Sequence, residues 1–235
     1  MQLAPPPSGR PTPTDVPGAL EAAAEVLGHR PAITLLRAEG REEQGVASLR
    51  QWAAKGAHLL EADLLLEPGD RVALRAPVGW GAAAVALAAW WAGLVVTLDG
   101  DAEVAVVHEE RTAPPDAEDV LWLGDAIDGS PLAAVDGEAW AEAVQAFPDQ
   151  PPPPRGGADH VALEADGGTW TQGELLARVE AEGTEGTLGI EAATIDPVAG
   201  LLAVALRPLV ASRPTVVLAG ADRAAADGER VAVWH

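Results

Sequence analysis

The chain has 235 residues, 48% of them hydrophobic, which is enough to bury one large core or two modest ones. Its formal net charge of −21 comes from 36 acidic and 15 basic residues, and such a surface repels nucleic-acid phosphates and anionic membranes. There is no cysteine, which excludes disulfides, thiolate nucleophiles and cysteine-bound metals and fits a cytoplasmic protein. We therefore expect no nucleic-acid and no membrane partner.

The first 17 residues are rich in proline and lack a basic segment followed by an apolar one, so they predict a disordered tail, not a signal peptide. Residues 78–98 contain no charge and are long enough to span a bilayer. However, alanine dominates this stretch, Gly93 divides it, and Val95 and Val96 favour a strand. The sequence therefore predicts a buried helix followed by a buried strand.

Short apolar runs alternate with helical patterns along the rest of the chain, which favours mainly parallel sheets flanked by helices. We expect strands at 32–36, 71–76, 94–98, 102–107, 119–123, 161–165, 187–193, 215–218 and 230–234. Five helices are expected. The first begins at Ser48, where Gln51 completes a capping box, and the second runs over 81–92. The third begins at Asp136 and continues to 146, the fourth begins at Thr171, and the fifth runs over 197–210.

Residues 148–157 include four consecutive prolines and two glycines, and a proline run cannot continue a helix or a central strand. This segment predicts a linker between a first α/β subdomain, residues 18–147, and a second, residues 158–235. Two nearly uncharged helix–strand units, 79–98 and 196–218, occupy corresponding places in the two subdomains. This correspondence suggests an internal duplication.

Common catalytic motifs are absent from the sequence, including the phosphate loop that ends in Gly-Lys-Ser/Thr and the Gly-x-Ser-x-Gly nucleophile elbow. The five histidines occur singly, without metal-ligand spacing. We interpret His-Glu-Glu at 108–110 as solvated surface, because adjacent residues point in different directions. Residues 125–129 are interpreted as a turn, since later calcium ligands are missing. The pair at 90–91, Trp-Trp, ends an apolar helix and is expected in the core.

One glycine-rich pattern is typical of nucleotide-binding folds. Gly79 and Gly81 follow a predicted strand and open a helix, and Asp99 ends the next strand. In a dinucleotide fold, the glycines let pyrophosphate approach the helix and the acid binds the ribose. Here the turn before Gly79 is longer than in that fold and Trp80 is bulky. We therefore favour close helix–sheet packing by small residues and keep a dinucleotide site as an alternative.

Four motifs follow one another at residues 31–33 (Pro-Ala-Ile), 47–49 (Ala-Ser-Leu), 68–73 (Pro-Gly-Asp-Arg-Val-Ala) and 92–93 (Ala-Gly). In order and spacing they resemble the opening of the adenylate-forming superfamily, which includes acyl-CoA synthetases. Residues 195–218 resemble that family's later helix and strand. The resemblance implies two similar three-layer αβα subdomains, equivalent to part of the family's N-terminal domain.

In that family a Ser/Thr/Gly-rich loop ending in lysine holds the ATP phosphates, between a strand and the next helix. The resemblance places Asp166, Gly167, Gly168, Thr169 and Thr171 at this position, and they are the candidate cofactor-binding residues. The loop is much reduced here and has no lysine, so we expect no bound ATP or AMP and predict no catalytic or metal-binding residues. The chain also ends before the family's Tyr-Gly-x-Thr-Glu segment and its C-terminal lid.

The leading hypothesis is a degenerate, non-catalytic homologue of these enzymes that acts as a binding or partner protein. One alternative is a subunit of an acyl-adenylate or acyl-CoA ligase that a partner chain completes. Another is a dinucleotide-binding domain that uses Gly79, Gly81 and Asp99. A homodimer or a partner protein is expected to cover the surface that later parts of the family's fold would cover.

Overall fold

A computed structural model describes residues 12–126, 128–183 and 186–235. The strands are β1 (Pro31–Arg37), β2 (Arg41–Gly45), β3 (Arg71–Arg75), β4 (Val95–Thr97), β5 (Val104–His108), β6 (Asp119–Leu123), β7 (Glu138–Ala139), β8 (Val161–Ala165), β9 (Gly168–Thr171), β10 (Thr187–Glu191), β11 (Thr215–Ala219) and β12 (Val231–Trp234). They form a five-stranded sheet of order β12-β10-β11-β1-β2 and a seven-stranded sheet of order β7-β6-β5-β3-β4-β8-β9. Neighbouring strands are parallel, except in the hairpins β1–β2 and β8–β9.

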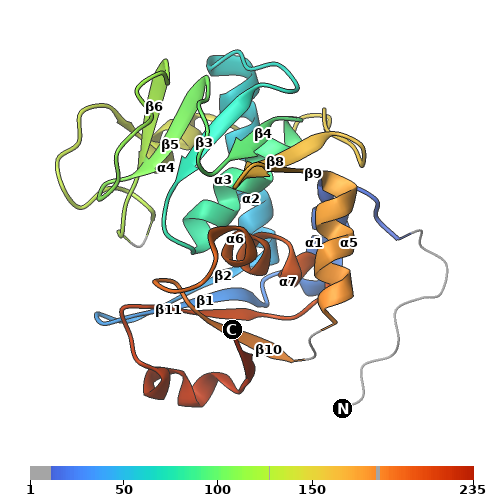
Figure 1. Cartoon of the computed structure of the whole chain (residues 1–235), viewed down its shortest axis with the longest axis vertical. Helices are drawn as coiled ribbons and strands as arrows, with labels where there is room; N and C mark the ends of the chain where they lie inside the picture. Colours follow the sequence, from blue (N-terminus) through green and yellow to red (C-terminus); the bar gives the residue numbers. More distant parts are fainter. Residues whose placement is uncertain (1–11, 127, 184–185) are drawn as a thin grey trace.

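The α-helices are α1 (Val16–Leu27), α2 (Val46–His58), α3 (Trp80–Trp91), α4 (Trp140–Ala143), α5 (Gln172–Glu182), α6 (Pro197–Ala205) and α7 (Arg207–Val210). A π-turn, η1 (Leu59–Asp63), extends α2, and two 3₁₀ segments, η2 (Val144–Ala146) and η3 (Arg223–Glu229), follow later. Figure 1 shows the longer helices between the two sheets. This arrangement confirms the predicted α/β fold of mainly parallel sheets flanked by helices.

The main core lies where both sheets pack on these helices. Leu35 of β1 and Val217 of β11 share one apolar cluster with Val72 of β3 and Val106 of β5. The helix α3 is buried along nearly its whole length, because its small side chains let α2 and α6 approach closely. No helix in the described ranges is long and apolar enough to cross a membrane.

Two hairpins are exchanged between the two halves of the chain. Strand β1 of the first hairpin pairs with β11, and strand β8 of the second hairpin pairs with β4. Each sheet therefore contains strands from both sides of residues 148–157. That segment is itself anchored, since Trp91 donates to the Pro152 carbonyl at 2.8 Å and accepts from the Arg155 N–H at 3.0 Å. The division at 148–157 thus does not separate the sheets, and both halves build one core.

Several local predictions differ from the structure. The tail was predicted to reach residue 17, but Asp15 caps α1 and Val16 is buried; residues 1–11 lie outside the described residues. The helix predicted from Ser48 begins earlier, at Val46, and the Ser48 hydroxyl donates to the Gln44 side chain at 2.6 Å. The helix predicted from Asp136 begins only at Trp140 and is one turn long before η2.

Three strands, β2, β7 and β9, were not predicted at all. All three lie at sheet edges, where one side of the backbone is unpaired and most side chains remain at least partly accessible. Their residues therefore need not alternate between apolar and polar, and the usual strand pattern is missing. The predicted cap at Thr171 is confirmed, as a full capping box with Glu174 at the start of α5.

Candidate ligand-binding cleft

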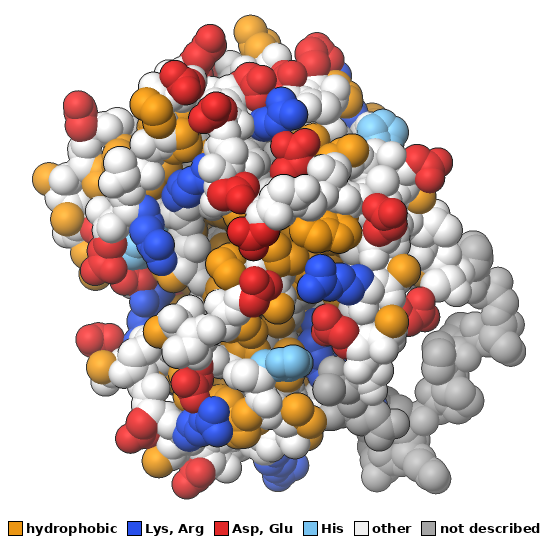
Figure 2. Space-filling model, viewed as in Figure 1, with side chains coloured by type: hydrophobic (Ala, Val, Ile, Leu, Met, Phe, Trp, Pro, Cys, Tyr) orange, Lys and Arg blue, Asp and Glu red, His pale blue; other side chains and the backbone are white. Residues whose placement is uncertain are grey.

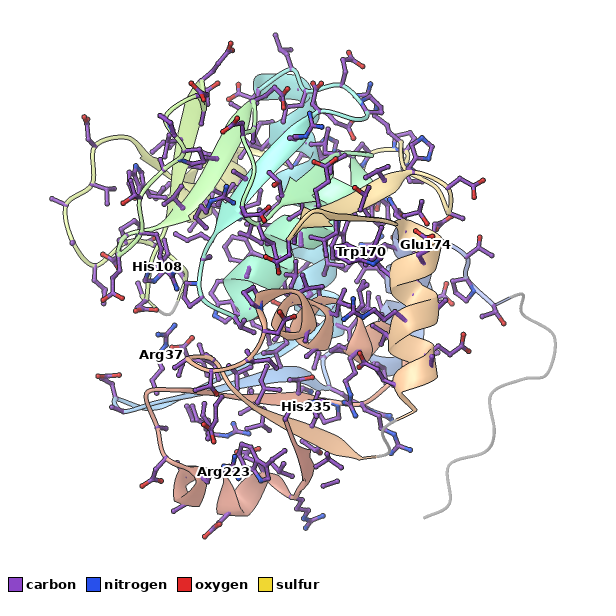
Figure 3. The ribbon with its side chains drawn as sticks, viewed as in Figure 1. Arg37, His108, Trp170, Glu174, Arg223 and His235 are labelled. Atoms are coloured by element: carbon purple, nitrogen blue, oxygen red, sulfur yellow. The ribbon has the colours of Figure 1, made fainter. Side chains whose placement is uncertain are left out.

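A cleft of about 280 Å³ opens where the two sheets face each other. Its walls come from the carboxyl ends of β1, β10 and β11 on one sheet and of β3, β5 and β6 on the other. In Figure 3, Arg37 and His108 lie on opposite sides of this opening. Ligands of open α/β proteins commonly bind beyond the carboxyl ends of the strands, so the cleft is the best-placed candidate site.

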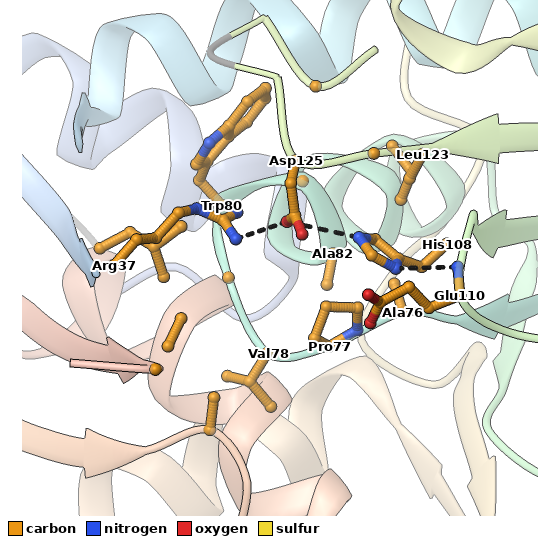
Figure 4. A pocket seen from close by; sticks show the side chains of 18 of the residues that line it. Arg37, Ala76, Pro77, Val78, Trp80, Ala82, His108, Glu110, Leu123 and Asp125 are labelled. Carbon is orange, nitrogen blue, oxygen red and sulfur yellow. Dashed lines mark hydrogen bonds and ion pairs between the residues drawn. The ribbon is translucent and has the colours of Figure 1, made fainter. Parts of the chain in front are cut away.

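A chain of polar side chains crosses the cleft (Figure 4). The Arg37 guanidinium lies 2.5 Å from Asp125 Oδ1 and donates to Glu42 Oε1 at 3.2 Å. The same Asp125 oxygen lies 3.3 Å from His108 Nε2. Because Arg37 ends β1 whereas Asp125 follows β6, these contacts join the two sheets at the mouth of the cleft.

The position of His108 contradicts its interpretation as solvated surface. Its side chain is only 5% exposed, and its Nδ1 accepts the Glu110 N–H at 3.3 Å. Its Nε2 is buried and makes no hydrogen bond with good geometry, although Asp125 is near. Since Nδ1 accepts, the ring proton belongs on Nε2, which leaves a buried donor on the cleft wall.

The neighbouring Glu109 holds the loop that follows β6. Its carboxylate accepts the backbone N–H groups of Asp125, Leu132 and Ala133, at 3.3, 3.1 and 2.7 Å. Burial acts to raise the pKa of Glu109, but these three hydrogen bonds outweigh it and lower the pKa. The carboxylate is therefore a structural anchor for the loop that carries Asp125.

Ligand atoms of His108, Glu109 and Asp125 lie within 4.8 Å of one another, so we tested whether they suit a metal ion. The Glu109 oxygens already accept three N–H groups, and Asp125 is paired with Arg37. A metal-bound histidine usually donates its other ring N–H, whereas the second nitrogen of His108 faces a donor. The contacts therefore do not suit a cation.

The N-terminus of α3 forms the floor of the cleft. Gly79, in an extended conformation with φ of 177°, precedes the helix; no side chain caps it and its first turn contains no acid. The Trp80 ring does not block it, since its Nε1 donates to Glu42 at 3.2 Å and the ring packs on Trp52 with centroids 5.5 Å apart. The backbone N–H groups of this first turn therefore face the cleft.

The glycines of this turn are not explained by close packing, contrary to the favoured interpretation. A Cβ atom at Gly81 would lie 3.7 Å from Leu123, and one at Gly79 would lie 3.9 Å from Leu35. Both are ordinary van der Waals distances, so a Cβ atom fits at either position. What the glycines provide instead is an uncovered backbone beside the cleft.

A second hollow of about 330 Å³ adjoins the cleft and shares Val78 and Arg111 with it. Arg75, on its wall, donates to the carbonyls of Thr97 and Gly100, and burial lowers the pKa of this guanidinium. Arg111 is exposed and its guanidinium has no partner among the described residues. Figure 2 shows basic as well as acidic side chains on this face, and Arg37 and Arg75 also line the two hollows.

The predicted cofactor-binding residues lie elsewhere in the same sheet, along the hairpin β8–β9 beyond β4. Asp166 and Gly167 form a two-residue turn between β8 and β9, with Ala165 paired to Gly168. Thr169 is exposed on β9, and the Thr171 hydroxyl is occupied in the α5 capping box. None of these five residues lines the cleft.

Asp99 also lies beside this turn, where its carboxylate accepts the Asp166 N–H at 2.8 Å. The structure thus places Gly79 and Gly81 in the cleft, whereas Asp99 is engaged with the hairpin. The acid that the dinucleotide alternative requires is therefore already bound to the protein's own backbone.

Sequence reasoning missed Arg37, Arg111 and Asp125 as cleft residues and dismissed His108. The sequence did contain one usable signal. Each of these four residues lies at the end of a strongly apolar strand or within a few residues after it. Carboxyl ends of parallel strands meet at one sheet edge, so polar residues there are brought together. That Arg37 crosses from one sheet to the other depended on the exchange of hairpins.

Comparisons with known proteins agree with this architecture. The chain superposes on a Mycobacterium tuberculosis fatty acyl CoA synthetase (16% identity, TM-score 0.71), covering 94% of this chain and 49% of that one. It also superposes on a long-chain-fatty-acid-CoA ligase from Archaeoglobus fulgidus (16% identity, TM-score 0.71), covering 94% of this chain and 50% of that one. With an anthranilate CoA ligase solved with anthranoyl-AMP, the identity is 12% and the TM-score 0.72, and the match covers 96% of this chain and 50% of that one.

The chain thus has the fold of the N-terminal part of acyl-CoA synthetases and related adenylate-forming enzymes, as the motifs predicted. It spans about half the length of these structural neighbours. By sequence it is 40% identical over 78 residues to a "TIGR03089 family protein" of Mycobacterium tuberculosis, which is 33% of this chain and 32% of that protein. No protein-family model matches the chain.

Proposed function

We propose that this chain is a non-catalytic binding protein built on the fold of adenylate-forming enzymes. The observation that carries the proposal is the two-residue turn at Asp166 and Gly167. In the adenylate-forming family that the sequence resembles, this position is occupied by the loop whose backbone and lysine bind the ATP phosphates. A hairpin turn of this length offers neither a row of N–H groups nor a cation to the phosphates.

The electrostatics around the turn support the same proposal. Asp166 is exposed and its N–H is bound by the Asp99 carboxylate, so the turn presents acidic groups where the family presents positive ones. Lys55, the sole lysine of the sequence, lies on α2 and is paired with Asp149 at 3.3 Å. Transfer of an adenylyl group requires positioned cations and donors that neutralise developing phosphate charge.

A carboxylate-dependent exchange of labelled pyrophosphate into ATP tests the proposal. We expect no exchange above background with short-chain, long-chain or aromatic acids, while an intact acyl-CoA synthetase assayed in parallel exchanges readily. Exchange that is present in the purified chain and lost in Thr169→Ala would overturn the proposal. Exchange that appears only after a second protein is added would favour the partner-completed ligase instead.

A further inference from the structure

A trough of about 690 Å³ lies between helices α1 and α5, and α7, which contacts both of them, forms its base. Its apolar lining includes Ala19, Ala22, Ala23 and Val26 of α1, Leu176 of α5 and Leu209 of α7. The residues from α1 follow the spacing of a single helix face, and Val26 is 61% exposed. The structure therefore leaves an apolar stripe of α1 without a partner, in a hollow of the size that small ligands occupy.

The trough is narrow, with an apolar interior and polar rims. Ala23, Leu176 and Leu209 line it although they are only 5%, 7% and 6% exposed, so a thin body reaches them and a folded segment does not. Arg30 and Arg213 are exposed on the rims. A helix of a partner protein would rest on these charged rims, whereas an aliphatic chain fits the interior.

The two arginines of the rim lie at the same end of the trough. Ile33 of β1 pairs with Thr215 of β11 in a parallel register, so Arg30 and Arg213 both come just before the start of neighbouring strands. Neither guanidinium has a hydrogen bond or an ion pair with a described residue. Two free cations therefore stand beside one end of an apolar hollow.

The charge at this end is opposite to that of the whole chain. The lining contains two arginines and one acid, Glu180, whereas the chain has a net charge of −21. Burial lowers the pKa of the neighbouring Arg207, and the positive charge of Arg213 lowers it further, although Glu182 acts in the opposite direction. A negatively charged group complements this end of the trough.

We propose that the trough binds a single-chain anionic amphiphile. Its aliphatic chain lies along the stripe of α1 from Ala19 to Val26, and its head group lies on Arg30 and Arg213. Carboxylate, sulfate and phosphate head groups share this chemistry, because a guanidinium donates paired hydrogen bonds to each of them. The inference goes beyond the proposed function, since the trough shares no residue with the cleft or with the turn at Asp166.

Calorimetric titration of the full chain tests this site, with decanoate and decyl sulfate as probes below the concentrations at which they form micelles. We expect at least one of them to bind with a stoichiometry of one. Decyltrimethylammonium, which has the same chain and the opposite charge, and butyrate, which has a short chain, should not bind. Binding of decanoate alone identifies a carboxylate ligand, and binding of decyl sulfate alone identifies a sulfate or phosphate ligand. Binding of neither anion, or equal binding of the cation, overturns the proposal.

Arg213→Glu places the probe in the trough. It should weaken binding by about tenfold, since a repulsive group replaces a charge-assisted hydrogen bond. Arg178→Glu is the matched control, because Arg178 is also exposed but lies outside the trough, over the Trp170 ring. Its affinity should match that of the parent. Equal affinities of the two variants would place the probe elsewhere and overturn the proposal.

Ala22→Phe fills the trough from the half-buried side of α1, so it should abolish binding while the protein stays folded. Ala177→Phe, on the exposed face of α5 outside the trough, is its control and should bind normally. If Ala22→Phe does not fold, the Arg213→Glu comparison decides. Sedimentation of the parent tests a second copy as the occupant. A dimer that dissociates in Val26→Asp, together with no binding of either anion, would overturn the proposal in favour of self-association.

Discussion

The two halves of the chain, residues 31–97 and 161–219, use the same order of elements for different ends. Each contains a hairpin, a helix, a strand, a second helix and another strand, and the hairpins are exchanged between sheets. In the first half the hairpin turn supplies Arg37 to the cleft and α3 begins uncapped; in the second half the turn is only two residues long and α6 is capped. The first half therefore lines the cleft with a hairpin turn and an uncapped helix start, whereas the second half lines it with the ends of β10 and β11.

The helix ends are anchored differently as well. At the end of α3, Trp90 donates to the Ala162 carbonyl of β8 at 2.6 Å and Trp91 donates to Pro152. At the end of α6, the buried Arg207 donates to the Gly186 carbonyl at 2.8 Å and to Pro214 at 3.1 Å. The anchors of α3 therefore reach later segments outside the first half, whereas Arg207 binds carbonyls on both sides of α6 within the second half.

The largest expected effect comes from separating the halves. A fragment of residues 1–148 lacks β8 and β11, which pair with β4 and β1, so both sheets lose a parallel neighbour. We expect it to aggregate or to melt without cooperativity, as followed by circular dichroism. Co-expression with residues 149–235 should restore a cooperative transition. A fragment that melts cooperatively by itself would show that the halves are independent domains.

The next largest effect is expected for Trp90→Ala. The side chain is fully buried between the halves and its N–H satisfies the Ala162 carbonyl, so its removal should lower the free energy of unfolding by about 3–5 kcal/mol. Urea denaturation measures this loss. Trp170→Ala, at the half-buried edge strand β9, is the control and should cost clearly less. Equal losses would mean that the contact between halves is not the source of stability.

An intermediate effect is expected where the helix caps differ. Asp196→Ala removes the side-chain cap of α6 and should destabilise the protein by about 1 kcal/mol. Gly79→Ala at the uncapped α3 removes no side-chain hydrogen bond, so it should destabilise the protein less than Asp196→Ala does. Denaturation curves of both variants test the comparison. Equal destabilisation would show that α3 is not open in the way that we describe.

The smallest expected effect is on the pH dependence of stability, and it comes from the segments in which α2 and α5 end. Helix α5 ends at Gly183 in the left-handed conformation, whereas α2 continues as the π-turn that contains Glu61. Burial raises the pKa of Glu61, although nearby Arg155 and His58 act to lower it. A raised pKa favours the protonated form in the folded state, so its stabilisation is present at acidic pH and is lost as pH rises through the folded pKa.

Glu61→Gln should therefore raise the unfolding temperature at pH 7 by about 1–2 °C, and this advantage should disappear below a pH of about 4. Thermal melts across this pH range measure the difference. Glu39→Gln, in the exposed turn between β1 and β2, is the control and should show no such trend. A Glu61→Gln advantage that is independent of pH would exclude carboxylate burial as the cause.

Much of the fold was predictable, because strongly apolar strands and long periodic helices declare themselves locally. Strand β6 and the capping box at Thr171 were found as the structure has them, and α3 and β12 within one residue. Strand β2 escaped detection, since an edge strand with one accessible side needs no apolar residues. Helix α1 was not predicted at all, and its start is fixed by a distant contact, because the Val16 N–H donates to Gln172 of α5 at 2.9 Å.

The candidate site shows the same division between local and distant causes. The sequence alone determined that the segment 166–169, which the resemblance aligns with the phosphate loop, is acidic and lacks lysine. It also determined that Gly79 opens a helix after a strand. Only the tertiary structure decided that this helix end faces a cleft, that Asp99 is bound to the Asp166 backbone, and that His108 is buried beside Asp125. The physical reason is that sheet order follows from pairing between distant strands, and here the exchanged hairpins bring Arg37 from one sheet to Asp125 on the other.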